Sequence, residues 1–280
     1  MTKTTMTTNG FLTLPDGTIE YIKHGEGKPL LICLHGFGDS AKLFSVLAPT
    51  LQKRYTVYAI SLPFHGKSTW KKKQFTLNTL IEVIELIKQK EKQERLSIMG
   101  YSLGGRSALM LVPHYYKLLD HLYLCAADGI KTHRLYDFAQ LPHWFSVIVP
   151  IVMRSHKLMF WLVGLAYRKQ WISKFLYDFT YNHFNTKEQR RRFFGCTTFV
   201  KSSRNMNLEQ VQAYLNKEKV PVDLYFGKRD EVILMEGAQE FEKAVDGATL
   251  YTLDKGHLLI DEDLMLLLEK QLNTKVKREH

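Results

Sequence analysis

Residues 100–105 read Gly-Tyr-Ser-Leu-Gly-Gly and place one serine between glycines two positions before and two after it. Ser102 follows an apolar run at residues 96–99, typical of a strand, and precedes a stretch of helical periodicity. A side chain at the apex of so sharp a strand-to-helix turn leaves no room for neighbouring Cβ atoms, which explains Gly100 and Gly104. The spacing predicts that Ser102 is a nucleophile rather than a serine in an ordinary glycine-rich turn.

A serine hydroxyl is a weak nucleophile, so this hypothesis needs a base and an acid that orients the base. His257 follows the last predicted strand, and Asp230 follows the strand before it. The order Ser, Asp, His along the chain is that of one known type of catalytic triad. All three residues follow strands, and the active sites of open α/β sheets lie at the carboxyl ends of the strands. Asp128, at the end of an earlier strand, is the competing acid.

Acyl transfer also needs hydrogen-bond donors for the negative charge that develops on the carbonyl oxygen. The backbone N–H of Leu103 opens the helix after the serine, and the helix dipole favours negative charge there. We expect the second donor to be the N–H of Phe37, in a loop after an early strand, with His35 and Gly36 of this loop against the substrate. These residues imply no metal and no organic cofactor.

The elements that must position these residues alternate along the chain. Apolar runs typical of strands covered on both faces lie at residues 30–34, 55–60, 96–99, 121–126, 222–226 and 249–253. Helical patterns lie at residues 41–52, 77–92, 103–113, 235–245 and 264–272. Two short extended runs around residues 15–17, Pro-Asp-Gly, predict an N-terminal hairpin. The alternation predicts an α/β fold with a mostly parallel, doubly wound sheet.

Residues 131–207 interrupt this alternation and are far longer than a normal connection between strands. Their periodicity is helical, with apolar stretches at residues 144–153 and 158–167 that are each too short to span a membrane. We therefore predict an α/β core made of residues 1–130 and 208–280, and a helical cap made of residues 131–207.

The predicted cap holds most of the net charge of +11, with 13 Lys or Arg against 3 Asp or Glu, whereas the rest of the chain has 26 against 25. It also carries 16 of the 34 aromatic residues. Such a lid suits an anionic or amphiphilic acyl substrate. In one alternative the aromatic side chains only pack the cap against the sheet and the cations form its solvated face. In another, residues 190–194, Arg-Arg-Arg-Phe-Phe, make transient contact with an anionic membrane surface. No recognised nucleic-acid-binding motif accompanies these basic residues, so we do not expect nucleic-acid binding.

The three cysteines, Cys33, Cys125 and Cys196, lack metal-like spacing, and we interpret them as buried free thiols in a reducing compartment. The N-terminus shows no secretory signal, so we expect a cytoplasmic protein. The sequence leaves the oligomeric state open.

Together, residues 35–36, residues 100–105, Asp230 and residues 256–257 resemble the α/β-hydrolase superfamily, in members with a helical cap between the sixth and seventh strands. The likeness extends over residues 11–273. It implies a serine esterase or thioesterase that works through an acyl-enzyme and disfavours the aspartate-dependent dehalogenase and epoxide hydrolase branches.

One stretch departs from the family pattern. Residues 61–68 are similar to the usual Asp-x-Pro-Gly-His-Gly-x-Ser, with Ser61 in place of the aspartate and Phe64 in place of the glycine. These departures leave the triad alone and concern the geometry of the loop.

With Arg106 included, the serine turn is similar to that of the menaquinone-pathway succinyl-hydroxy-cyclohexadiene-carboxylate synthase, a lyase that uses the same triad as a base. This resemblance implies that Arg106 reads a substrate carboxylate and that Tyr101 is a pocket wall. The alternative is that Arg106 makes only surface contacts. We favour hydrolysis of a carboxylic ester or thioester, with the lyase and a low-turnover ligand-binding protein as alternatives.

Overall fold

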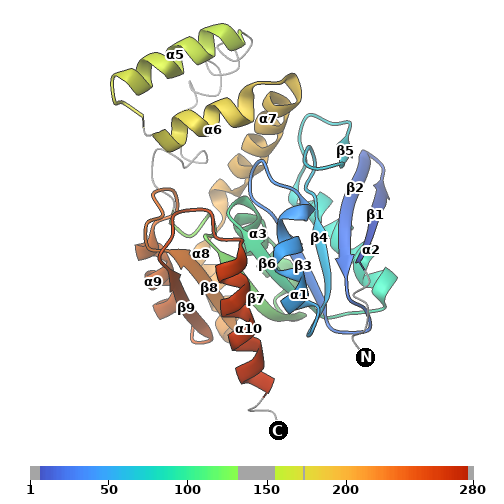
Figure 1. The fold of residues 1–280 in the computed structure, drawn as a ribbon. Helices are drawn as coiled ribbons and strands as arrows, with labels where there is room; N and C mark the ends of the chain where they lie inside the picture. Colours follow the sequence, from blue (N-terminus) through green and yellow to red (C-terminus); the bar gives the residue numbers. More distant parts are fainter. Residues whose placement is uncertain (1–6, 132–154, 173, 277–280) are drawn as a thin grey trace.

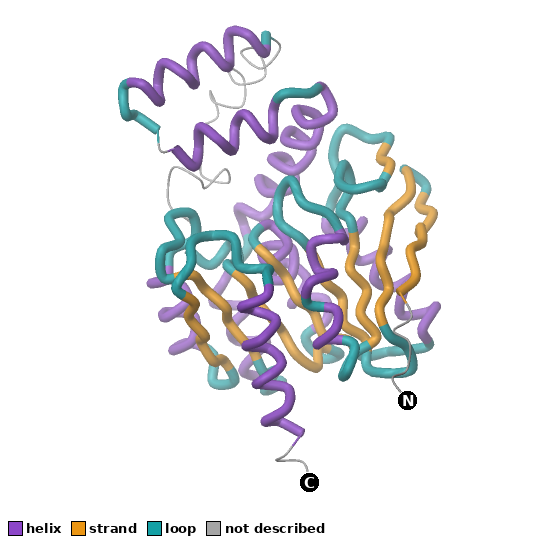
Figure 2. Tube along the Cα trace, viewed as in Figure 1, coloured by secondary structure: helices purple, strands orange, loops and turns teal. Residues whose placement is uncertain are grey.

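The computed structural model describes residues 7–131, 155–172 and 174–276 (Figure 1). Within these ranges nine strands form one sheet in the order β1-β2-β4-β3-β6-β7-β8-β9, with β5 added beside β2. Helices cover both faces of the sheet (Figure 2). These are the layers of a doubly wound α/β protein, as the sequence predicts.

An antiparallel hairpin forms one edge of the sheet, as predicted around residues 15–17. β1 (Thr7–Leu14) pairs with β2 (Gly17–His24) along its whole length. β2 also pairs with β4 (Thr56–Ile60) in the antiparallel sense, and the short strand β5 (Thr69–Trp70) lies against the start of β2. The hairpin thus extends the parallel part of the sheet by two strands.

The remaining strand pairs are parallel. They join β4 to β3 (Leu30–Leu34), β6 (Leu96–Tyr101), β7 (Leu119–Cys125), β8 (Val222–Gly227) and β9 (Ala248–Leu253). Every residue of β3, β4, β6 and β8 is buried, which confirms strands covered on both faces, whereas the edge strand β9 is only partly covered. Because the carboxyl ends of these strands share one edge, the residues that follow them can meet there.

Two hydrophobic cores lie on opposite faces of the sheet. One contains the buried sides of α2 (Leu77–Glu91), α3 (Leu103–Tyr115), α8 (Leu208–Lys217) and α9 (Met235–Ala244). The other contains those of η1 (Ala41–Val46), α1 (Ala48–Leu51) and α10 (Glu262–Val276). The single helix predicted for residues 41–52 is instead a 3-10 helix followed by one α-helical turn. Pro49 lies in the first turn of α1, a position that proline tolerates, whereas it would disrupt the interior of one continuous helix.

The chain inserts further helices between β7 and the return to the sheet. They are α5 (His156–Arg168), α6 (Lys174–Phe184), α7 (Lys187–Ser202) and the short 3-10 helix η2 (Ser203–Asn205). α5 confirms the helix predicted at residues 158–167, whereas the one predicted at residues 144–153 lies outside the described residues. In Figure 1, α5 is the outermost of these helices, and α6 and α7 lie between it and the sheet.

Among the described helices, none is both long enough and apolar enough to cross a bilayer.

Candidate active site

The predicted nucleophile lies in a strained backbone turn. Ser102 stands between the end of β6 and the start of α3 with φ 51° and ψ −115°, a conformation that a residue with a side chain rarely adopts. Its N–H donates to the carbonyl of Cys125 on the neighbouring strand at 3.0 Å. A Cβ at Gly100 would collide with the carbonyl of Gly104, and a Cβ at Gly104 would collide with the carbonyl of Leu34. Both glycines are therefore required for the close packing of this turn, as the sequence predicts.

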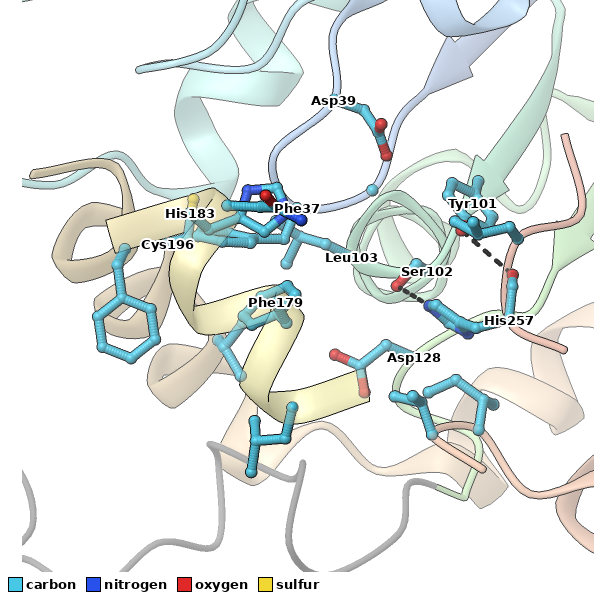
Figure 3. A pocket seen from close by; sticks show the side chains of 18 of the residues that line it. Phe37, Asp39, Tyr101, Ser102, Leu103, Asp128, Phe179, His183, Cys196 and His257 are labelled. Carbon is cyan, nitrogen blue, oxygen red and sulfur yellow. Dashed lines mark hydrogen bonds between the residues drawn. The ribbon is translucent and has the colours of Figure 1, made fainter. Parts of the chain in front are cut away.

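Three residues from distant parts of the chain form one hydrogen-bonded series at this turn. His257 Nε2 lies 3.0 Å from Ser102 Oγ, and His257 Nδ1 lies 2.8 Å from Asp230 Oδ2. Figure 3 shows the imidazole pointing at the serine hydroxyl. The Asp230 side chain is 0% exposed, and its other oxygen accepts the N–H groups of Val232 at 2.8 Å and Ile233 at 3.0 Å. These bonds fix the carboxylate, which in turn orients the imidazole.

The competing acid, Asp128, has a different partner. Both of its carboxylate oxygens accept bonds from Arg106, from Nε and Nη2 at 2.7 Å each, and Arg106 Nη1 donates to Ser203 Oγ at 2.7 Å. Arg106 is only 5% exposed and does not line the cavity at the serine. In the structure the carboxylate that Arg106 binds belongs to the protein, and its role as a reader of a substrate carboxylate stays a prediction. Because the side chain is buried, Arg106 is not a residue with mere surface contacts.

The residues predicted to flank the substrate divide into two groups. Gly36 and Tyr101 line the cavity, and the Tyr101 hydroxyl donates to the carbonyl of His257 at 3.1 Å. His35 is fully buried and does not line it: Nε2 accepts the N–H of Leu62 at 3.0 Å and Nδ1 donates to the carbonyl of Gly36 at 2.6 Å. Burial lowers the pKa of His35 to about 4, so the imidazole is neutral and acts as a brace for the loop.

The two residues that carry the predicted oxyanion donors, Phe37 and Leu103, both line the cavity that holds Ser102. Leu103 is the first residue of α3, where an N–H has no acceptor within the helix. Phe37 lies in the loop after β3, and in the described part of the chain its N–H donates to no protein group. Its ring packs against Phe179 and His183 of α6, with centroids 5.6 and 5.5 Å apart. The inserted helices thus contact the loop that carries the predicted second donor.

The loop that departs from the family pattern is held by a carboxylate from another strand. Ser61 Oγ donates to Glu20 Oε2 at 2.8 Å and accepts the N–H of Ala41 at 3.0 Å. The N–H of Lys67 also donates to Glu20 Oε2, at 2.8 Å. Phe64 has φ 70°, the left-handed conformation for which the family's glycine is suited. Glu20 therefore supplies on β2 the negative charge that Ser61 lacks.

A cavity of about 370 Å³ adjoins the triad. Its apolar wall is made by Leu176, Phe179, Phe193, Cys196, Val200, Val232, Ile233 and Leu258. Leu258 is also 76% exposed, so the cavity opens to solvent there. Three carboxylates line the cavity, those of Asp39, Asp128 and Asp178, and within the described chain no lysine or arginine does. The lysines and arginines that the structure describes within residues 155–207 therefore do not line the substrate position, and the expected anionic substrate stays a prediction.

Three of these cations bind backbone carbonyls instead. Arg190 Nη1 donates to Phe184 O at 2.9 Å, Arg191 Nη2 to Trp70 O at 2.7 Å, and Arg192 Nε to Phe64 O at 3.0 Å. Phe193, next in sequence, is buried in the cavity wall. These bonds join α7 to α6, to β5 and to the loop that contains Phe64. Contact of residues 190–194 with a membrane stays a prediction, and these three arginines already have partners within the protein.

Two cavity residues escaped the sequence analysis. Asp39 follows the Phe37 loop directly, which is the one signal that could have identified it, and burial raises its pKa to about 6. His183 on α6 packs over Gly38, and no sequence pattern indicates this contact.

The three cysteines are buried free thiols, as predicted. Cys196 also lines the cavity, and burial raises the pKa of its thiol to about 12. Its thiol is therefore not an activated nucleophile.

The fold and the site define a class. A serine at a strained strand-to-helix turn, hydrogen-bonded to a histidine that a buried aspartate orients, is the site of the α/β hydrolases. Residues 29–264 match the family described as alpha/beta hydrolase fold, so the chain belongs to that family and is a hydrolase of the alpha/beta class.

Individual relatives agree with this assignment. The chain is 26% identical over 261 residues to the uncharacterized hydrolase YugF of Bacillus subtilis (strain 168), covering 91% of this chain and 93% of that protein. The enol-lactonase of Burkholderia xenovorans LB400 superposes with a TM-score of 0.69 at 16% identity, over 94% of this chain and 98% of that one. The carboxylesterase CesB of Bacillus subtilis gives 0.63 at 17% identity, over 95% and 90%. At such identities these two structures establish the fold alone.

Proposed function

We propose that the protein is a serine hydrolase that cleaves a neutral carboxylic ester or thioester through an acyl-enzyme on Ser102. The observation that carries this proposal is the unbroken series from Asp230 through His257 to Ser102, at 2.8 and 3.0 Å, beside an apolar cavity. A serine whose hydroxyl already touches a positioned imidazole needs no rearrangement to lose its proton.

Acylation begins with attack of Ser102 Oγ on the carbonyl carbon of the substrate. The proton of the hydroxyl passes to His257 Nε2, and Asp230 holds the other ring nitrogen and stabilises the imidazolium that forms. The N–H groups of Phe37 and Leu103 hold the negative oxygen of the tetrahedral intermediate. Collapse of this intermediate breaks the bond to the leaving oxygen or sulfur, which takes the proton from His257 Nε2.

Deacylation repeats these steps with water in place of the serine. His257 Nε2 takes a proton from the water as it attacks the acyl carbon, and then returns a proton to Ser102 Oγ as the acid departs. Every step uses side chains and amides of this chain.

The cavity wall supports a neutral acyl group of modest size. A volume of about 370 Å³ lies near the lower end of the range for small-molecule sites, and the wall is mostly apolar. A carboxylate on the substrate would face Asp39 without a nearby cavity-lining cation. The enol-lactonase and the carboxylesterase that share the fold act on esters by name, which supports ester cleavage as the reaction.

The two alternatives differ in what they require. The lyase depends on Arg106 as a carboxylate reader, and Arg106 binds Asp128. A low-turnover ligand-binding protein would bind esters tightly and release no acid, which an assay of turnover distinguishes from a hydrolase.

A fluorophosphonate probe, which reacts with activated serines, tests the nucleophile. We expect wild type to be labelled, Ser102→Ala to be unlabelled, and the control Ser107→Ala, which changes a buried serine one turn further along α3, to be labelled like wild type. Equal labelling of Ser102→Ala would show that another residue reacts. Turnover of p-nitrophenyl esters of graded length should be highest for short and medium acyl chains.

A further inference from the structure

α5 is the outermost helix of the described molecule, and one of its faces packs on α6 (Figure 1). Met159, Phe160 and Val163 point inward into a small hydrophobic cluster with Phe184 and Phe193. The Phe160 ring lies 4.4 Å from that of Tyr181, between centroids. This face explains how α5 is held on the molecule.

The opposite face of α5 is also apolar. Leu158, Trp161, Leu162 and Leu165 follow the spacing i, i+3, i+4, i+7 and are 45%, 63%, 38% and 38% exposed. Trp171, just after the helix, is 74% exposed. A helix that is apolar on both faces is normally buried on both, and a contiguous exposed apolar surface marks a site of contact. We call these five residues the α5 surface.

The charged residues around the α5 surface indicate which kind of partner it binds. Residues 155–172 contain three lysines or arginines, Lys157, Arg168 and Lys169, and no aspartate or glutamate. Lys174, further along the chain, is paired with Asp178 at 2.6 Å and is not counted. Lys157 and Arg168 lie exposed at the two ends of α5. A second copy of the chain docked through the same surface would bring these cations together, whereas an anionic surface would neutralise them. Exposed indole rings between cations are typical of helices at the boundary of lipid headgroups and acyl chains.

We propose that the α5 surface docks the protein on an anionic lipid bilayer, with α5 lying in the plane of the membrane. With 13 residues the helix is about 20 Å long, shorter than the hydrocarbon core of about 30 Å, so it lies on the membrane and does not span it. Apolar side chains and basic side chains supply the two contributions that reversible membrane binding needs.

Docking would place the substrate cavity close to the lipid. Leu176, Phe179 and His183 of α6 line that cavity, and α6 packs directly against the inner face of α5. The membrane proposal goes beyond the proposed hydrolase chemistry and does not depend on it, because binding to vesicles is measured without substrate.

Sedimentation of the full chain with vesicles tests the proposal. We expect binding to vesicles of phosphatidylcholine with about 30% phosphatidylglycerol, weak binding to phosphatidylcholine alone, and loss of binding at high salt. The double variant Trp161→Ser, Trp171→Ser should lower the partition coefficient at least about ten-fold. The matched control, Phe11→Ser with Leu266→Ser, removes two exposed apolar side chains, 53% and 58% exposed, from β1 and α10 and should bind like wild type.

A charge variant provides an independent test in case the tryptophan variant does not fold. Lys157→Glu with Arg168→Glu should lower binding to the anionic vesicles and leave circular dichroism and probe labelling of Ser102 unchanged. Failure of wild type to sediment with anionic vesicles would overturn the proposal, and so would equal binding by the tryptophan variant. Concentration-dependent dimerisation in light scattering that Trp161→Ser, Trp171→Ser abolishes, without vesicle binding, would assign the α5 surface to a second copy instead.

Discussion

We expect two aspartates near Ser102 to have separable roles, one in chemistry and one in the fold. Asp230→Asn should lower kcat for an ester about 10³-fold or more with little change in stability, because an amide beside His257 Nδ1 favours the wrong tautomer. Asp128→Asn should instead cost about 3–5 kcal/mol of unfolding free energy, because the buried Arg106 loses its charged partner. Steady-state kinetics and urea unfolding of both variants measure the two effects. A large stability loss in Asp230→Asn with normal catalysis would reverse the assignment.

We expect the burial of Asp39 to lower the free energy of unfolding in a way that depends on pH. Burial raises its pKa to about 6, while His257 and Arg192 oppose that shift. A carboxyl whose pKa is higher in the folded state ionises more easily when unfolded, so its penalty is absent below about pH 4 and complete above about pH 6. Asp39→Asn should therefore stabilise the protein by up to about 2 kcal/mol at neutral pH, and the gain should shrink as pH falls toward 4. Urea unfolding at several pH values measures this difference, and a gain independent of pH would refute the explanation.

Among the elements, α7 contacts the loop that carries Phe37, whose N–H we propose as the second oxyanion donor. Arg192 Nε donates to Phe64 O at 3.0 Å and Nη1 contacts Gly38 O at 3.5 Å, next to Phe37. Arg192→Met keeps much of the length and removes both donors. We expect kcat to fall about ten-fold with little change in KM, because the N–H of Phe37, which this loop positions, would bind the substrate oxygen mainly in the transition state. Arg190→Met, which loses bonds to residues 184 and 185 only, is the control. A rise in KM at constant kcat would show that Arg192 serves substrate binding instead.

Patterns local in sequence predicted most of the elements and the three residues, Ser102, Asp230 and His257, that the structure brings into one hydrogen-bonded series. Apolar runs identified the parallel strands because burial on both faces leaves a direct signature in β3, β4, β6 and β8. The serine turn was predictable because steric exclusion of Cβ atoms fixes the glycine spacing. The sequence did not predict which hydrogen-bond acceptor each long polar side chain binds. The partner of Arg106 is 22 residues away in the sequence, and the carbonyls that bind Arg191 are 120 and 121 residues away.

For the whole molecule, net charge and the charge at the site have opposite signs. The chain carries +11, yet the lining of the cavity contains three carboxylates and, in the described part of the chain, neither lysine nor arginine. Arg106 offsets Asp128 and Lys174 offsets Asp178, at 2.7 and 2.6 Å, whereas Asp39 has no ion pair within 4 Å in the described chain. The local field therefore opposes an anionic substrate although the distant surface attracts one.

This difference predicts selectivity against carboxylates. A phenyl ester of butyric acid should be hydrolysed with a kcat/KM at least about ten-fold higher than the monophenyl ester of glutaric acid, because the free carboxylate of the glutarate would share the cavity with the Asp39 carboxylate. The preference should grow as pH rises through about 6, where Asp39 becomes charged, and should decline in Asp39→Asn. Kinetics of both esters at several pH values measure it. A preference for the glutarate ester would contradict this explanation and would indicate a cationic group close enough to the bound substrate to compensate its charge.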